Sequence, residues 1–321
     1  MKKYLFNHFV LLAIFLSLFA FRTQAQLRID LQYRPRFEIR DGHQKLAAEG
    51  ATPAVLVSQR TRIILTYEKE FLKFKFTPQD VRIWGDEKLK GATGVFGDSA
   101  SLDLLEAYGE LKLGTLGWIS VGRQQLRYDN YRLLGDRNWN QYGLSYDAVV
   151  LKLSPKEFNL HIGAVWNTLN DAGTENLYPS NRLKSMNFLW INKSFSKNLS
   201  ASILHVASGV TQSDTTSKLN FRQTTGLFIE NKSEGLNFWI DAYYQYGKNQ
   251  KGVTVSAYLF GTTASYNIGL FTPAVGFLYL SGNSKSSTLD CMNSKRSPLG
   301  NTALRLYARS TFARKRGLRS L

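Results

Sequence analysis

The amino-acid sequence predicts an all-β fold, an antiparallel up-and-down β-barrel that crosses a membrane. Three observations lead to this prediction. The chain begins with an export signal, no later segment has the ~20 apolar residues that a transmembrane helix needs, and many segments alternate apolar with polar residues. Aromatic residues make up 13% of the chain, as is typical of such barrels, and the one cysteine, Cys291, excludes a disulfide framework. A soluble periplasmic β-sandwich is the alternative.

Residues 1–25 have the form of a secretory signal peptide. Lys2 and Lys3 supply the positive start, residues 5–21 are mostly apolar, and the small residues before Gln26 predict cleavage after Ala25. A retained membrane anchor is the alternative reading. No cysteine follows the cleavage site, so the sequence gives no sign of lipoprotein anchoring. We therefore expect an exported protein of the outer membrane of a Gram-negative cell.

The barrel domain is predicted over residues 26–283. In residues 29–40 the odd positions are apolar and the even positions polar or charged, which indicates a strand with two different faces. Pro78 interrupts the alternation and marks an edge or bulge. We expect about thirteen strands before Ser281, each near the ~9–11 residues of a tilted membrane strand. Short turns alternate with long polar connections, as an up-and-down barrel requires. The same alternation recurs in residues 60–67, 72–77, 105–113, 158–167 and 236–245.

The densest stretch is residues 122–147, where a connection between two strands is rich in Arg, Asp and aromatic residues. Loops usually carry small polar residues, so this composition predicts an ordered and functional connection.

Residues 284–321 are predicted to be a basic tail outside the barrel, either disordered or out of frame. They contain nine Lys and Arg residues against one acid, Asp290, and no alternating segment long enough to span a membrane. One reading is an extension that binds nucleic acid or acidic surfaces. The other, favoured by the abrupt change of composition, is loss of the reading frame near Ser284; truncation and a genuine tail remain open.

No catalytic or metal-binding motif occurs in the sequence, so we expect no enzymatic activity, no metal and no cofactor. His161 and His205 lie on predicted strands, and a lipid hydrolase embedded in the barrel wall is therefore an alternative. A non-conducting structural or adhesion barrel is another.

Arginines concentrate in the first strands and in the dense connection. If the polar face lines a lumen, these guanidinium groups gather in one sector and favour anions, since arginine stays charged and pairs with carboxylates. The structural alternative is that Arg–carboxylate pairs fill and brace the barrel. The predicted lumen cations are Arg34, Arg36, Arg60, Arg62, Arg82, Arg123, Arg127 and Arg132. The predicted carboxylate partners are Glu38, Asp80, Glu106, Asp129 and Asp147.

Four segments in order, QRTRIILTYE, QDVRIWGDE, LLEAYGEL and GRQQLRYDNYRLLGDRNWNQYGLSYDAVVLK, make the sequence resemble the alginate-export family of outer-membrane porins. The resemblance covers about residues 27–283 and implies a barrel of about eighteen strands that conducts acidic polysaccharide or related solutes through an Arg/Lys-lined constriction. It implies Arg60, Arg62, Arg82, Arg123 and Arg132 as lumen cations with Asp80 and Asp129 as partners. The expected partners are outer-membrane lipid, an anionic solute and the barrel-assembly machinery, without nucleic acid.

Overall fold

The structure is a computed structural model that describes residues 27–42, 46–85, 102–155, 157–169, 171 and 177–281, and the backbone of residues 302–310. The predicted signal peptide and the rest of the basic tail lie outside the described residues. Within the described part, no helix is long and apolar enough to cross a membrane.

All described strands belong to one antiparallel sheet of fourteen strands, in which each strand pairs with its neighbours in sequence. Thirteen of them end before Ser281, so the predicted up-and-down order and the predicted count are confirmed. The strands are β1 (Leu27–Arg40), β2 (Ala54–Glu68), β3 (Leu72–Ile83), β4 (Leu102–Leu113), β5 (Gly117–Gln124), β6 (Tyr146–Leu153), β7 (Asn159–Trp166), β8 (Ser185–Ser194), β9 (Leu199–Thr211), β10 (Leu219–Asn231), β11 (Leu236–Lys248), β12 (Thr254–Tyr266), β13 (Phe271–Leu280) and β14 (Thr302–Ser310).

The last strand differs from the expectation of a tail outside the barrel. Thr302–Ser310 forms β14 and pairs with β13 from Phe271↔Ser310 to Tyr279↔Thr302. Its sequence, TALRLYARS, alternates apolar with cationic residues over part of its length, a pattern that the high arginine content of the tail obscures. Among the described strands, β1 pairs only with β2 and β14 only with β13.

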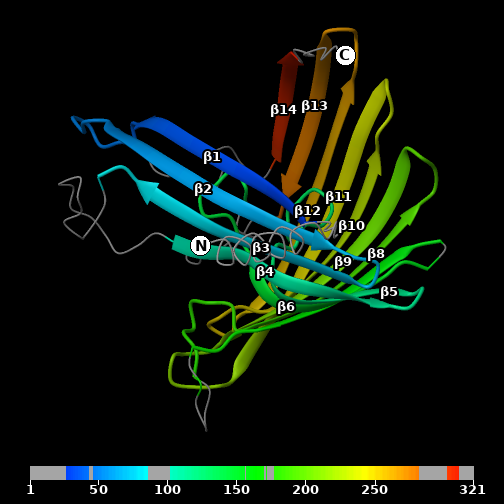
Figure 1. Cartoon of the computed structure of the whole chain (residues 1–321). Coiled ribbons are helices and arrows are strands. Elements are labelled where there is room, and N and C mark those ends of the chain that lie inside the picture. The colour runs from blue at the N-terminus through cyan, green and yellow to red at the C-terminus, as the bar shows by residue number, and fades with distance from the viewer. Residues whose placement is uncertain are drawn as a thin grey trace, which may run out of the picture.

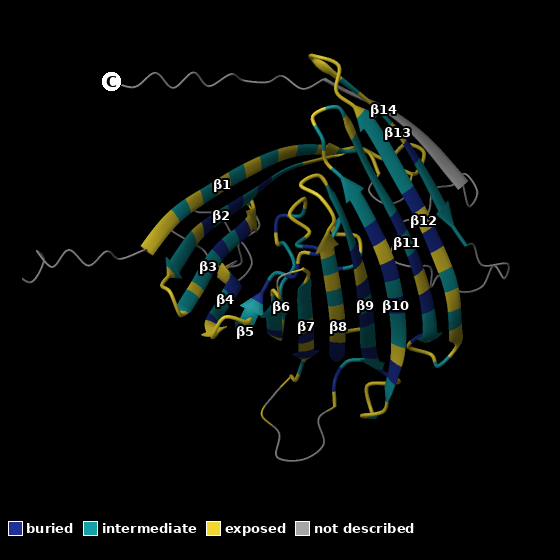
Figure 2. Cartoon of the chain, turned by 90° about the vertical axis from the view of Figure 1, so that its right-hand side faces the viewer, coloured by how far each residue is buried: buried dark blue, intermediate teal, exposed yellow. Residues whose placement is uncertain are grey.

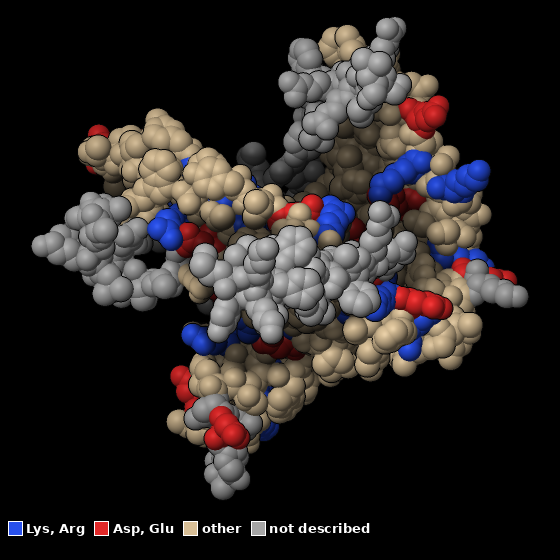
Figure 3. Space-filling view, viewed as in Figure 1, with Lys and Arg blue, Asp and Glu red and all other residues tan. Residues whose placement is uncertain are grey.

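The sheet curves around a hollow, and the connection between β5 and β6 lies inside the curve (Figures 1 and 2). Residues directly opposite each other in an antiparallel pair share a face, so the register assigns each strand residue to the inner or the outer face. Arg34 is opposite Arg60 on the inner face, whereas Leu31 and Ile63 are opposite each other on the outer face and are 77% and 43% exposed. In the view of Figure 3, Lys and Arg side chains lie beside Asp and Glu side chains in several places, and uncharged residues cover much of the remaining described surface.

The inner face has two chemically different halves. The inner residues of β1–β4 are mostly charged or amide side chains, including Arg60 and Gln79. The inner residues of β6–β9 are mostly apolar, and Val150, Phe188 and Leu204 belong to the buried core cluster. The core therefore lies inside the hollow, between the wall of β6–β9 and the connection.

The irregularity predicted at Pro78 is present, but the extra residue is in β4. The register between β3 and β4 shifts at Thr77/Pro78: Thr77 is opposite Glu106 and Pro78 is opposite Leu104, so Leu105 has no partner in the ladder. β3 itself keeps its alternation past the proline, because Gln79 stays opposite the inner residue Arg62.

Candidate functional site

The connection, residues 125–145, is an ordered segment that crosses the hollow. Asp129, Tyr131 and Arg137 adopt left-handed backbone angles, with φ of 52°, 61° and 48°, and no other non-glycine residue of the described chain does so. Such conformations are unfavourable for non-glycine residues and persist only where the surroundings hold them. The connection therefore needs strong anchors, and the structure contains three.

The first anchor is apolar and lies on the wall of β6–β9. Leu126, Tyr128 and Leu134 of the connection join the core cluster, and they are 3%, 6% and 2% exposed. The Tyr128 hydroxyl lies 3.0 Å from His161 Nδ1 on β7. Burial of these side chains stabilises the packed position by roughly 1.5–3 kcal/mol for each large residue.

The Asp129 carboxylate lies next to the apolar anchor and binds the wall of β6–β9 through hydrogen bonds. Trp190 Nε1 donates to Asp129 Oδ1 at 2.8 Å, and the Ser202 hydroxyl donates to the same oxygen. Burial raises the pKa of the Asp129 carboxyl, and the hydrogen bonds from Ser202 and Trp190 only partly offset that rise.

The second anchor is a set of arginines on the wall of β1 and β2. Arg34 donates to the carbonyl oxygens of Asn138 (2.7 Å) and Asn140 (2.9 Å) and to Gln141 Oε1 (2.7 and 2.9 Å). Arg60 donates to the carbonyl oxygen of Asn140 at 3.1 Å and to Asn138 Oδ1 at 3.0 Å.

Arg62 completes this set from deeper in β2. It donates to the carbonyl oxygen of Tyr142 at 3.3 Å and to Gln79 Oε1 at 2.9 Å, and Gln79 Nε2 donates to the same Tyr142 oxygen at 2.9 Å. Arg60 is 0% and Arg62 5% exposed. Guanidinium groups suit this task, because their five donors can bind several carbonyl oxygens at once.

The charges of these arginines are not neutralised by acids. Within the described part of the chain, no carboxylate forms an ion pair with Arg34, Arg60 or Arg62, whose partners are carbonyl and amide oxygens. We call Arg34, Arg60 and Arg62 the arginine cluster. It braces the connection, as the structural alternative holds, and at the same time keeps three positive charges beside the hollow.

The third anchor lies across the hollow on β11. Asp241 Oδ2 accepts hydrogen bonds from Arg132 Nε at 2.6 Å and from Asn130 Nδ2 at 2.8 Å, and Asp241 is 0% exposed. The sequence alone does not single out Asp241. Its signal is a single carboxylate at an inner position of the aromatic strand FWIDAYYQY, where an unpaired charge would be costly.

The predicted cations occupy three places. Arg34, Arg36, Arg60 and Arg62 lie on the inner face, Arg127 and Arg132 lie in the connection, and Arg82 and Arg123 lie on the outer face. Arg36 pairs with Glu38, and Arg127 Nε lies 2.8 Å from Asp136. Glu106 is also on the inner face, but its partner is Lys75, at 2.6 Å.

The prediction that Arg82 and Asp80 line the lumen is wrong. They are opposite Gln59 and Thr61 on the outer face, and they form an ion pair with each other at 2.8 Å. From the sequence we expected Pro78 to shift the inward–outward alternation within β3. The extra residue of the bulge is instead Leu105 in β4, so the alternation of β3 continues unchanged.

Arg123 and Asp147 are likewise on the outer face, so they too are not lumen residues. They are opposite each other and form a bidentate pair, with both distances 2.9 Å. Their neighbours Gln124 and Ala148 are the inner residues, 2% and 5% exposed. In a strand of mixed polarity the sequence does not show which alternate positions face inward, so the prediction that Arg123 and Asp147 line the lumen is wrong.

Arg137 is a further cationic residue, which the sequence alone does not single out. It lies exposed in the connection with a left-handed φ of 48°, and its side chain has no ion pair among the described residues. A charged residue in an unfavourable backbone conformation is a signal of function that only the structure gives.

The two histidines lie in different environments. His161 faces the hollow beside Tyr128, and His205 faces outward with Nδ1 2.9 Å from Thr225 Oγ1. Among the described residues, no three His, Cys, Asp or Glu side chains form a group that could hold a metal ion.

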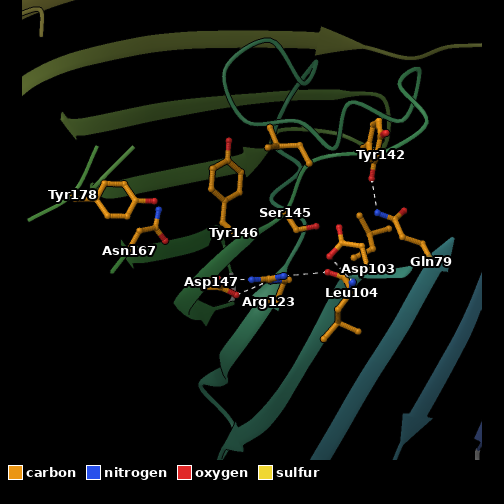
Figure 4. A pocket seen from close by; sticks show the side chains of 13 residues that line it. Gln79, Asp103, Leu104, Arg123, Tyr142, Ser145, Tyr146, Asp147, Asn167 and Tyr178 are labelled. Atoms are coloured by element: carbon orange, nitrogen blue, oxygen red, sulfur yellow. Dashed lines mark hydrogen bonds and ion pairs between the residues drawn. The ribbon is translucent and has the colours of Figure 1, made fainter. Parts of the chain in front are cut away.

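A polar cleft of about 310 Å³ lies where the last residues of the connection meet the ends of β4, β5 and β6 (Figure 4). Arg123, Asp147 and Asp103 lie on one side of it, with Arg123 bound to Asp147 and, at 3.4 Å, to the carbonyl oxygen of Leu104. Asn167 and Tyr178 approach from the segment after β7.

Comparisons with known proteins agree with this architecture. Residues 25–279 match the family model described as alginate export. A comparison with curated protein sequences gives no match. OccAB1 of Acinetobacter baumannii is similar in structure, with a TM-score of 0.57, 14% identity, and coverage of 81% of this chain and 66% of that one.

Two further solved structures show the same fold. OccK8 (OprE) of Pseudomonas aeruginosa has a TM-score of 0.53 and 13% identity, over 79% of this chain and 68% of that one. An anion-selective porin from Comamonas acidovorans has a TM-score of 0.50 and 11% identity, over 79% of each chain. At these identities the likeness concerns the fold alone, and the chain spans 66% of the length of OccAB1.

Proposed function

Since the chain belongs to the alginate export family and is an antiparallel β-barrel protein of the outer membrane, we propose that it is a channel for passive diffusion of anionic solutes. The proposed solutes are acidic oligosaccharides or polysaccharides of the alginate type, in line with the description of the family. The proposal includes no enzymatic step.

The arginine cluster is the observation that carries this proposal. Its three guanidinium groups have carbonyl and amide partners, which satisfy their hydrogen bonds but leave their charges in place. Two unit charges about 4 Å apart interact by about 4 kcal/mol at an effective dielectric of 20, against about 1 kcal/mol in bulk water. A buried positive cluster beside a narrow passage therefore attracts anions and repels cations.

More exposed cations complete the proposed pathway. The side chains of Arg36 and Arg127 are 37% and 44% exposed, so a solute carboxylate can reach them, where it competes with their ion-pair partners Glu38 and Asp136. Arg137 is exposed on the connection as well. Arginine stays charged and binds carboxylates in a bidentate manner, which replaces part of the hydration that the solute loses on entry.

The test is the ion selectivity of purified protein in planar lipid bilayers, measured as the reversal potential in a salt gradient. We expect an anion-selective current, and a severalfold lower anion-to-cation permeability ratio in the double variant Arg60→Gln, Arg62→Gln. The charge-conserving variant Arg60→Lys, Arg62→Lys should stay close to the wild type, because the charge is retained while the multiple hydrogen bonds are lost.

The matched control is Arg82→Gln, Arg123→Gln, which removes the same charge from the outer face and should leave selectivity unchanged. Heat-modifiable migration in gels would check that each variant folds. A wild-type current carried mainly by cations would refute the proposal, and so would equal selectivity in wild type and a folded Arg60→Gln, Arg62→Gln variant.

A further inference from the structure

Four polar side chains gather on the outer face of β8, β9 and β10, where lipid surrounds the barrel. Asn187 is opposite Ala207, and Ala207 is opposite Gln223, so the two amides lie in one row across the three strands. His205 and Thr225 are opposite each other in the next outward-facing row. We call Asn187, His205, Gln223 and Thr225 the outer polar patch.

The outer polar patch lies at the depth of the hydrocarbon core of the membrane. It faces outward, because the sequence neighbours Phe188 and Leu204 belong to the core cluster inside the hollow. β9 and β10 have thirteen residues each, and His205 and Thr225 stand at their midpoints. Gln223 is two residues, or about 7 Å, from Thr225 along β10, which is less than half of the ~30 Å thickness of the hydrocarbon core. Polar groups at this depth are costly unless another polar group binds them.

On another part of the outer face, such groups are bound within the chain. Gln59 Oε1 on β2 accepts hydrogen bonds from the Tyr33 hydroxyl at 3.2 Å and from Trp84 Nε1 at 3.0 Å. The outward-facing charges of β3, β5 and β6 form the two ion pairs described above. The polar side chains of this part of the wall therefore need no partner from outside the chain.

The outer polar patch, in contrast, is only partly bound. His205 Nδ1 lies 2.9 Å from Thr225 Oγ1. The side-chain amides of Asn187 and Gln223 have no hydrogen-bond partner among the described residues. The Asn187 side chain is exposed and that of Gln223 half-buried. Lipid tails offer no donor and no acceptor, so the patch needs a polar partner within the membrane.

A mostly apolar groove of about 550 Å³ lies beside the amides, on the outer face of β6–β9. Ala164 and Ala207 flank Asn187 in its row, and their small side chains lower the surface there. Ile162 and Leu189 are opposite each other in the next row and are 46% and 36% exposed. Small residues let two chains approach closely within a membrane, as they do between membrane helices.

The chemistry of the patch selects its partner. An amide is self-complementary, because it both donates and accepts hydrogen bonds. Two copies of the same patch can therefore satisfy each other around a twofold axis. All copies of the chain have the same orientation in the outer membrane, so this axis runs along the barrel and brings similar depths together. Ala207 lies between Asn187 and Gln223, and an axis beside it brings the amides of two copies near one another.

The same axis places a side chain of one copy against the groove of the other. The groove lies on the β6–β8 side of Ala207, so a twofold rotation turns it toward the β10–β11 side of the second copy. Tyr244 on β11 faces outward there, opposite Thr225, and is 48% exposed.

We propose that the outer polar patch and the groove form the contact surface for a second copy of this chain, which gives a twofold-symmetric pair of barrels. The amides of Asn187 and Gln223 bond to the amides of the second copy, and Tyr244 of each copy enters the groove of the other. The contact lies on the outer face, so this inference does not rest on the proposed anion pathway.

The first experiment measures the mass of the full chain in mild detergent by native mass spectrometry. We expect the wild type to be a pair of copies. The double variant Asn187→Leu, Gln223→Leu keeps side chains of similar size but removes the polar groups, so we expect its pairing to be at least tenfold weaker. The matched control is Gln59→Leu, which removes an outward-facing amide that is bound within the chain, and it should stay paired.

A second experiment locates the contact in the intact membrane. In a Cys291→Ser background, Ala207→Cys places a thiol beside the proposed axis, and oxidation should link two copies. The matched control is Ala107→Cys on the outer face of β4, opposite Arg123, which should link at least tenfold less. Non-reducing gels would measure both yields.

Several results would overturn the proposal. They are a wild type that stays single, a folded double variant that pairs as tightly as the wild type, and equal linking of the two cysteine variants. A single copy that retains a lipid in the mass spectrum would assign the groove to an acyl chain instead. The ion selectivity of the double variant should equal that of the wild type, so failure of the pairing and failure of the proposed channel are distinguishable.

Discussion

Asp129 shows how a single residue combines strain and burial at this site. Its backbone has a left-handed φ of 52°, and its carboxylate accepts hydrogen bonds from the wall of β8 and β9. Aspartate and asparagine tolerate this conformation better than most residues, which explains the residue type. Its ionised form is nevertheless disfavoured, because burial raises its pKa.

The sign of the resulting pH dependence follows from this shift. The ordinary pKa of an aspartate carboxyl is 3.8. At pH values just above it, the folded chain keeps the Asp129 proton more readily than the unfolded chain does. The free energy of unfolding therefore falls as pH rises from 3.8 through the raised pKa. Asp129→Asn removes the charge and keeps an acceptor oxygen. We expect it to be at least as stable as the wild type at neutral pH and less sensitive to pH in that window, as measured by urea unfolding in lipid vesicles.

Asp214→Asn is the control for this prediction. The Asp214 carboxylate accepts a hydrogen bond from the main-chain N–H of Ser180 at 2.7 Å, which lowers the pKa of this carboxyl. The Asp214→Asn substitution should therefore change the free energy of unfolding in the opposite direction to Asp129→Asn. Equal changes in the two variants would contradict burial as the cause at Asp129.

Among the residues of the site, sequence alone could identify the arginine cluster but not its partners. Arg60 and Arg62 were identified because alternation places them on the polar face of β2. Arg60 and the Asn140 carbonyl oxygen that it binds are 80 residues apart in the chain. A main-chain carbonyl has no sequence signature, so no pattern could show that arginines hold a connection rather than face open solvent.

At the scale of the strand, β4 and β5 approach each other closely at Gly122. This glycine has a φ of 123°, and an added Cβ would lie 2.4 Å from the carbonyl oxygen of Ala107. We expect Gly122→Ala to lower the free energy of unfolding by about 1–3 kcal/mol, because both the conformation and the contact are unfavourable. The shift of the urea midpoint would measure it.

Gly109→Ala on β4 is the matched control. The nearest atom to its added Cβ, the carbonyl oxygen of Lys73, is 3.9 Å away, an ordinary contact. Its midpoint should stay near that of the wild type. Equal destabilisation of the two variants would show that loss of glycine itself, and not the close approach at Gly122, decides the effect.

The strands also show where sequence reasoning reaches its limit. Alternation predicted about thirteen strands because the lipid-facing side of most strands is largely apolar. It misplaced Arg82 and Asp80, since a bulge can lie in either of two paired strands and only the register reveals that Leu105 is the extra residue. Alternation did not predict β14, because Arg305 and Arg309 occupy its polar positions and the tail around it is strongly basic.

For the whole molecule, the connection is a cross-link between opposite walls of the hollow. It binds β1 and β2 through the arginine cluster, β7–β9 through the core cluster and Asp129, and β11 through Asp241. Its own ends are adjacent, because Gln124 is opposite Tyr146. A short turn could therefore replace residues 125–145 without moving β5 or β6.

We expect such a replacement, by a four-residue Asn-Gly turn, to raise the single-channel conductance severalfold, because the connection occupies the passage. Shortening the loop of residues 212–218 between β9 and β10 is the control and should leave the conductance unchanged. Single-channel recording would distinguish these cases. Equal conductance before and after removal of the connection would show that it does not narrow the passage.

The cross-link also imposes an order in time. Gln141 binds Arg34, 107 residues earlier in the chain, whereas Arg132 binds Asp241, 109 residues later. Contacts between such distant residues close large loops, and they form only after both strands are in place. The contact with β1 closes the chain from β1 to β5, and the contact with β11 closes the chain from β6 to β11. The passage is therefore narrowed from both sides only when most of the wall already exists.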